Sequence, residues 1–226
     1  MQPINYACVA KNKDAFIAQV VRYVSSGHYF YLTGTIPARK EPAKIDAKLI
    51  RLYGVDRPRW ARARRRLGKL AGMHYLRHDR FFILIATHGK SPFFSDHQSR
   101  FRDIRRNALK VGGYSIRYTW STVDRRWRVF VRLDREAYAN LRANMLQQAL
   151  QPQFAARDKF EALFTDLQWQ PYGPVREQLG SIVKASNRRR RYAGLPQARF
   201  ACLPRMRRVT TVYEARAPQP RTEETG

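Results

Sequence analysis

The chain has 226 residues and a formal net charge of +27, from 44 lysines and arginines against 17 aspartates and glutamates. Hydrophobic residues make up 44% of it, enough to bury a core, which excludes a disordered basic tail. Its two cysteines exclude a disulfide scaffold or a cysteine-rich zinc site, and no run approaches the roughly 20 apolar residues of a membrane helix. A charge excess of this size repels itself in the folded state, so the expected partner is a nucleic acid whose phosphates neutralise it.

The first part of the chain predicts alternating helices and strands. Apolar residues at helical spacing predict a helix over 12–26, and the aromatic and β-branched run 28–36 predicts a strand. A second helix is expected over 42–53. Two strands are then expected over 73–78 and 80–88, and the second should be central because it is apolar on both faces.

The segment DRPRWARARRRLGKL (56–70) predicts a helix crowded with arginine. We assign its apolar stripe to the core: Trp60, Ala63, Leu67 and Leu70. An anionic membrane would need an exposed amphipathic helix, and with this stripe buried no segment is expected to offer one. No acidic residue lies inside the helix to form i,i+4 ion pairs, so its basic face is expected to meet phosphate. The predicted phosphate contacts are Arg57, Arg59, Arg62, Arg64, Arg65, Arg66 and Lys69.

Two strands over about 111–121 and 126–133 predict a hairpin with one apolar and one basic face. In the first strand Arg117 lies between Ile116 and Tyr118, and in the second the arginines alternate with Trp127, Val129 and Val131. Alternate residues of a strand point to opposite faces. Such a basic face suits a nucleic-acid backbone. The predicted phosphate contacts are Arg117, Arg126 and Arg128.

From Asp134 onwards the pattern is helical. Three helices are expected, and the last runs into a cluster predicted to hold phosphates: Arg188, Arg189, Arg190 and Arg191. The fold class is therefore α+β, with a mixed or antiparallel sheet of about five strands, flanking helices and a helical C-terminal region. We expect an α+β nucleic-acid-binding core over 1–133, a helical region over 134–192, and a basic Pro/Arg-rich tail over 193–226, partly disordered.

The strand HYFYLTGTIP (28–37) resembles the first motif of rolling-circle replication initiators and related relaxases. In that family a later strand presents two histidines, separated by one apolar residue, which bind a divalent metal, and a downstream helical tyrosine attacks the DNA backbone. The resemblance implies a metal-dependent nicking enzyme. Here His74 and His78 are separated by three residues, which on a strand is about 13 Å, too far to share one ion. No metal site and no cofactor are therefore predicted, unless the nuclease alternative holds.

A longer segment, YLRHDRFFILIATHGKSPFF with RDIRR and GGYSI after it, resembles a set of uncharacterised bacterial proteins encoded near mobile elements. This second resemblance spans about residues 29–120 and implies no activity. If the chain is an enzyme, the candidate catalytic residues are His88, Asp96 and His97, on the loop after the central strand, and Tyr114 as nucleophile. The structural alternative is that His88 ends the strand and His97 contacts phosphate or solvent.

The leading hypothesis is a cytoplasmic nucleic-acid-binding protein without catalysis of its own, working with other proteins in a nucleoprotein assembly. One alternative is an endonuclease or replication initiator of a mobile element. The other is a structural protein of a ribonucleoprotein. Phosphate contacts carry no sugar identity, so RNA and DNA stay equally open.

Overall fold

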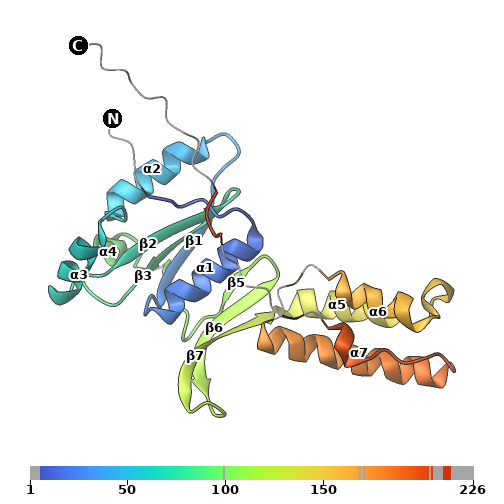
Figure 1. Ribbon diagram of the computed structural model, residues 1–226. Helices are drawn as coiled ribbons and strands as arrows, with labels where there is room; N and C mark the ends of the chain where they lie inside the picture. The colour runs from blue at the N-terminus through green and yellow to red at the C-terminus, as the bar shows by residue number, and fades with distance from the viewer. Residues whose placement is uncertain are drawn as a thin grey trace. The chain divides into compact units, whose positions relative to one another are not determined.

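The computed structural model describes residues 6–98, 100–167, 169, 172–203, 205 and 211–214. The chain divides into two compact units, the first formed by residues 1–102 and 209–226 and the second by 103–208 (Figure 1). The predicted boundary at residue 133 is therefore wrong. The two strands expected to complete the N-terminal core belong instead to the unit that holds the C-terminal helices.

A four-stranded sheet forms the first unit, with strand order β2-β3-β1-β4. Strand β3 pairs antiparallel with both β1 and β2, which confirms that the strand apolar on both faces is central. The strands are β1 (Phe30–Thr35), β2 (Met73–His78), β3 (Phe81–Ala86) and β4 (Arg102–Asp103). The helices are α1 (Lys13–Ser25), α2 (Pro42–Tyr53), α3 (Arg59–Leu67) and α4 (Pro92–Asp96).

Helices cover both faces of this sheet because its strands are apolar on both sides. Phe16 of α1 packs edge-on against Phe81, with ring centroids 5.7 Å apart. On the opposite face, Leu84 belongs to a buried cluster with Ile50 of α2 and Phe93 of α4. Residues 81 and 84 of one strand therefore face different helices, as strand alternation requires.

The second unit begins with a three-stranded antiparallel sheet of order β5-β6-β7, followed by helices. The predicted hairpin is β6 (Tyr114–Ser121) with β7 (Arg126–Leu133), and β5 (Leu109–Val111) adds a short third strand. The helices are α5 (Arg135–Gln148), α6 (Arg157–Thr165) and α7 (Gly173–Tyr192), with the 3-10 turns η1 (Pro152–Phe154) and η2 (Phe200–Cys202). The three predicted C-terminal helices are thus present, and each buries part of its apolar residues, among them Met145, Phe160 and Leu179.

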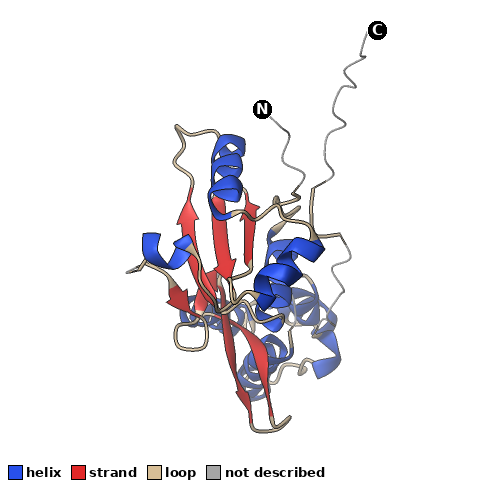
Figure 2. Ribbon diagram, turned by 90° about the vertical axis from the view of Figure 1, so that its left-hand side faces the viewer, coloured by secondary structure: helices blue, strands red, loops and turns tan. Residues whose placement is uncertain are grey.

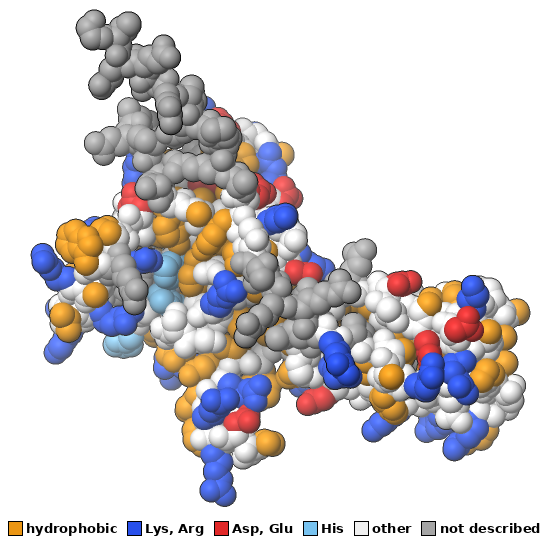
Figure 3. Space-filling view, in the orientation of Figure 1, with side chains coloured by type: hydrophobic (Ala, Val, Ile, Leu, Met, Phe, Trp, Pro, Cys, Tyr) orange, Lys and Arg blue, Asp and Glu red, His pale blue; other side chains and the backbone are white. Residues whose placement is uncertain are grey.

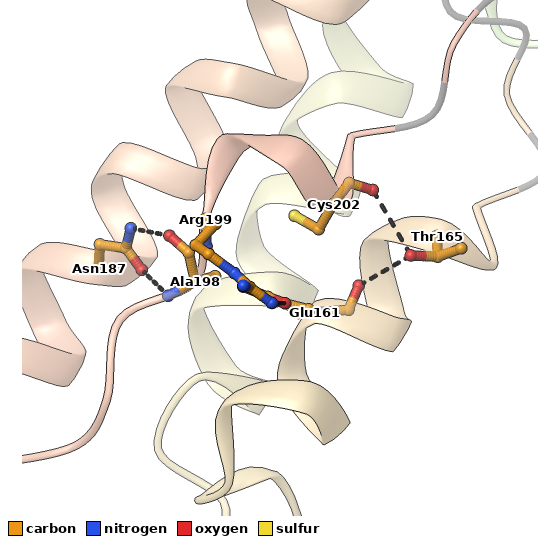
Figure 4. Close-up of polar contacts among 6 residues, drawn as sticks. All are labelled: Glu161, Thr165, Asn187, Ala198, Arg199 and Cys202. Atoms are coloured by element: carbon orange, nitrogen blue, oxygen red, sulfur yellow. Dashed lines mark hydrogen bonds and ion pairs between the residues drawn. The ribbon is translucent and has the colours of Figure 1, made fainter.

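The segment after α7 is held against α6 and α7 by polar contacts (Figure 4). The Asn187 side chain donates to the carbonyl oxygen of Ala198 at 2.8 Å and accepts from its N–H at 2.9 Å. Glu161 accepts from the backbone N–H of Arg199 at 2.7 Å and pairs with its guanidinium at 3.1 Å. The first part of the predicted tail is therefore packed on helices. The predicted disorder after about residue 215 lies outside the described residues.

The α+β class with antiparallel sheets is confirmed, although the strands form two sheets rather than one sheet of about five. No helix in the described part of the chain combines the length and the apolar character that crossing a membrane requires.

Candidate nucleic-acid interface

The β6–β7 hairpin carries its arginines on one face, as its alternation predicts. Directly opposed residues of an antiparallel pair point to the same side of the sheet. The opposed pairs on this face are Ser115 with Arg132, Arg117 with Phe130, Thr119 with Arg128, and Ser121 with Arg126. All four arginines are exposed. The hairpin therefore presents a row of cations along a two-stranded ribbon, and we call this row, Arg117, Arg126, Arg128 and Arg132, the arginine face.

The opposite face of the hairpin is apolar and changes character along its length. Near the helices, Tyr114 and Ile116 are fully buried. Towards the loop, Tyr118 is half-buried, and Trp120 and Trp127 are 49% and 50% exposed. The loop end of the hairpin projects beyond the helices of the same unit in both ribbon views (Figures 1 and 2). The helices thus cover only the base of this apolar face.

Local contacts fix the loop end of the hairpin. The Ser121 hydroxyl donates to the Asp124 carboxylate at 2.8 Å and accepts from the Asp124 N–H at 3.2 Å. Arg128 also pairs with Asp124, and this hydrogen bond is the main reason why the pKa of Asp124 is lowered. Arg125, at φ 48°, takes the left-handed conformation that closes the turn. Figure 3 shows cationic and hydrophobic side chains together at this end, lowest in that view.

At its base the arginine face opens into a cleft of about 590 Å³ within the second unit. Lys110 of β5 opposes Ser115, which in turn opposes Arg132, so three strands contribute one polar row to the cleft. Arg135 and Glu177 line it as well. The cations of the hairpin therefore continue, without a change of face, into a concave surface with three basic side chains.

Helix α3 has the opposite orientation from the one its sequence predicts. Trp60 is 65% exposed and Leu67 is 87% exposed, so the assignment of the apolar stripe to the core is wrong. Arg62 and Arg65 are instead half-buried, and Arg64 lies over the Trp60 ring at 5.4 Å. Arginine can pack in this way because its aliphatic stem is apolar. The expectation that no segment offers an exposed amphipathic helix required the apolar stripe of α3 to be buried. Because that stripe is exposed, the expectation loses its basis.

The predicted phosphate contacts of α3 are therefore divided between two sides of the helix. Arg64, Arg66 and Lys69 are exposed, and Arg57, before the helix, is exposed too. The side chain of Arg59 lies outside the described part of the structure.

The arginine run at the end of α7 contains one residue that does not face solvent. Arg190 is fully buried, with its guanidinium 4.5 Å from the Phe160 ring centroid. It donates to four carbonyl oxygens at 2.7–3.0 Å, those of Ala149, Phe154, Ala155 and Pro196. Its predicted phosphate contact is wrong, because the hydrogen-bonding groups of the side chain serve the protein's own backbone.

The other three arginines of this run, Arg188, Arg189 and Arg191, are exposed. Arg189 also donates to the carbonyl oxygen of Leu146 at 3.1 Å.

The candidate catalytic residues do not form one site. Tyr114 is fully buried against Trp169, with ring centroids 5.1 Å apart, so its hydroxyl cannot reach a phosphodiester. His88 is exposed, and its ring lies 6.0 Å from that of Phe30. Within the described residues, no group of three or more His, Cys, Asp or Glu side chains is placed to hold a metal ion.

His97 and Asp96 both lie beside Tyr53. The Nε2 atom of His97 is 2.7 Å from the Tyr53 hydroxyl, and the pKa of Tyr53 is raised by burial and by the exposed Asp96 carboxylate. This arrangement holds α4 against α2.

A network of histidine and tyrosine side chains inside the first unit has no counterpart in the sequence predictions. His74 stacks on Tyr23 at 4.2 Å between centroids, and its Nδ1 is 3.0 Å from the Tyr6 hydroxyl. The Tyr23 hydroxyl lies 3.0 Å from that of Tyr213. Burial lowers the pKa of His28 to about 4 and that of His74 to about 3, so both rings are neutral at pH 7. They act as packing and hydrogen-bonding groups.

Comparison of the chain with protein-family models, with curated proteins and with solved structures gives no match. The geometry above therefore carries the functional argument alone. The resemblances to rolling-circle initiators and to mobile-element proteins remain predictions.

Proposed function

We propose that this protein binds nucleic acid through phosphate contacts made by the arginine face of the β6–β7 hairpin. The observation that supports the proposal is the register, which places Arg117, Arg126, Arg128 and Arg132 on one exposed face. A two-stranded ribbon fits the major groove of B-form DNA, and guanidinium groups match phosphate oxygens with two hydrogen bonds each. Along β7 the cations stand at positions 126, 128 and 132, with Phe130 between the last two, and Arg117 of β6 lies directly opposite Phe130.

Ion pairing inside the protein does not cancel this charge. Of the four arginines, Arg128 has a salt bridge to Asp124, and no carboxylate of the described residues forms one with Arg117, Arg126 or Arg132. The cleft at the base adds Lys110 and Arg135, and the carboxylates of Asp134 and Glu177 also line it. The exposed arginines of α3 and α7 are secondary contacts in this proposal.

In this proposal the protein is a binding component of a nucleoprotein assembly, and its ligand is either DNA or RNA. The nicking-enzyme alternative has less support because its candidate nucleophile, Tyr114, is fully buried. The proposal therefore requires no reaction step.

The test compares two variants with the same net charge. One replaces Arg117, Arg126 and Arg132 with glutamine, and the control replaces exposed arginines on the helices of the same unit, Arg142, Arg157 and Arg176. Binding to a labelled 20-base-pair duplex is measured across a salt series. Each phosphate-binding arginine that is replaced should reduce the slope of log K against log salt by about 0.9, so the slope of the hairpin variant should fall by about 2–3 units.

The control variant should keep most of the wild-type slope. Equal reductions in both variants would show that total charge, and not the arginine face, determines binding. Absence of binding by the wild-type protein to duplex and single strands at about 0.1 M salt, where nonspecific phosphate binding is readily measured, would overturn the proposal itself.

A further inference from the structure

The loop end of the β6–β7 hairpin exposes three aromatic rings in contact with one another. Trp120 and Trp127 oppose each other across the two strands, with ring centroids 6.3 Å apart and planes at 74°. Tyr118 stacks on Trp127 at 5.6 Å with an angle of 21° between the planes. We call this group, Tyr118, Trp120 and Trp127, the aromatic end.

Core formation does not account for the aromatic end. The same apolar face is fully buried at Tyr114 and Ile116, nearer the helices, but half of each tryptophan remains in water. Packing of the two rings across the strands stabilises the hairpin by about 0.2–1 kcal/mol, but the exposed half of each indole contributes nothing to the hydrophobic stabilisation of the fold. Two large rings held by cross-strand packing at a projecting tip are instead a preformed surface for another flat group.

The charges around the aromatic end limit what can occupy it. Arg125 is exposed in the turn, and Arg126 and Arg128 are exposed on the opposite face of the same tip, with Asp124 the one carboxylate in the loop. A second copy of this hairpin would bring like charges together, which disfavours self-association through this surface. A ligand that offers flat apolar faces together with anionic groups at regular intervals satisfies both features, and an unpaired nucleic-acid strand has that chemistry.

We propose that the aromatic end binds single-stranded nucleic acid by stacking unpaired bases on Trp127 and Trp120, while phosphates of the strand meet Arg125 in the turn and continue to the arginine face behind it. This inference rests on the proposed function and deepens it by naming the ligand class. In a duplex the base faces are already stacked on one another and are inaccessible to a side chain, so the rings favour unpaired strands. Every base has an apolar face, so this contact is tolerant of sequence.

The experiment uses the full chain and two double variants. Trp120→Ala with Trp127→Ala removes the rings, whereas Trp120→Phe with Trp127→Phe keeps aromatic rings and removes the indole fluorescence. Both positions are half exposed, so the hairpin backbone does not depend on them for a core contact. The probes are a labelled 20-nucleotide single strand, its duplex, and inorganic polyphosphate, which carries the charge without bases.

The wild-type protein should bind the single strand more tightly than the duplex and show quenched tryptophan emission with the strand but not with polyphosphate. The affinity of the alanine variant for the single strand should fall roughly tenfold or more, and its affinity for polyphosphate should change little. The phenylalanine variant should retain most of the affinity while losing most of the quenching, because Trp60 and Trp169 lie elsewhere in the chain.

Two outcomes would overturn the inference. If the wild-type protein bound nucleic acid but the alanine variant bound the single strand as tightly, stacking would be wrong and the arginine-face proposal would stand. If the rings responded only to vesicles of anionic phosphatidylglycerol, with a blue shift of their emission, the aromatic end would be a membrane contact. Failure of the wild-type protein to bind any nucleic acid would instead remove the proposed function.

Discussion

Replacement of Arg190 by methionine should destabilise the helical part of the second unit. The guanidinium donates four hydrogen bonds to backbone carbonyls that come from the end of α5, from η1 and from the segment after α7. Methionine keeps an unbranched apolar stem but is shorter and has no donor. The variant would leave these carbonyl oxygens, some of them at helix ends where no intrahelical partner exists, without a hydrogen bond.

The expected destabilisation follows from two opposing contributions. A hydrogen bond from a charged donor stabilises by about 1.5–3 kcal/mol, so four such bonds amount to roughly 6–12 kcal/mol. Burying the guanidinium costs several kcal/mol, and the variant is relieved of that cost. The free energy of unfolding should therefore fall by about 3–5 kcal/mol, a large part of the stability of a typical domain.

The assay is urea unfolding followed by circular dichroism, with Arg188→Met as the matched control. Arg188 lies two residues earlier on the same helix and is exposed, so its replacement should change the free energy of unfolding by less than about 0.5 kcal/mol. If the two variants were destabilised by the same small amount, the hydrogen bonds to the carbonyls would not be responsible for holding these segments together. A decrease in nucleic-acid binding without any decrease in stability at Arg190 would restore its role as a phosphate contact.

Three further predictions concern the first unit. The pKa values of His28 and His74 are lowered from 6.5 to about 4 and about 3, so the unfolded state binds more protons than the folded state below pH 6.5. The free energy of unfolding, measured in urea, should therefore fall by about 2 kcal/mol per histidine between pH 7 and pH 5. Asp46→Asn, which removes the buried carboxylate 2.9 Å from Arg77, should lower the free energy of unfolding by about 3 kcal/mol, measured in urea. Gly89→Ala, at φ +138° and with a Cβ 2.6 Å from a backbone nitrogen, should lower the melting temperature, since such strain costs about 1–3 kcal/mol.

The strands and helices could be predicted because their signals are local. The aromatic and β-branched run over 28–36, the alternation over 126–133 and the helical spacing over 42–53 match elements of the structure to within a few residues. The basic face of the hairpin followed from the same alternation, since register alone decides which residues share a face. The number of sheets and the boundary between the units depend on pairings distant in sequence, and no local pattern reports them.

The two wrong assignments of arginine have different causes. Periodicity shows that α3 is amphipathic but not which side meets the rest of the unit, and arginine stems can form that contact. The burial of Arg190 could have been predicted from the helical period of α7. Buried positions recur at Val183, Ser186 and Arg190, so one of the four consecutive arginines must lie on the inner side of the helix. The histidine–tyrosine network could not be predicted, because it joins α1 to Tyr213 near the other end of the chain.

The net charge of the chain is therefore a poor guide to where it binds, and the pairing of its cations is a better one. Arg77 and Arg190 are occupied inside the protein, and Arg105 and Arg199 form salt bridges with carboxylates. The hairpin differs from all of these positions, since it combines exposed arginines on one face with half-exposed tryptophans on the other. In water the like charges repel, and the outer half of each indole stays hydrated although the two rings pack on each other. Both become favourable when one ligand supplies phosphates and flat bases together, which is why the hairpin is the part of this protein on which a nucleic acid should be sought first.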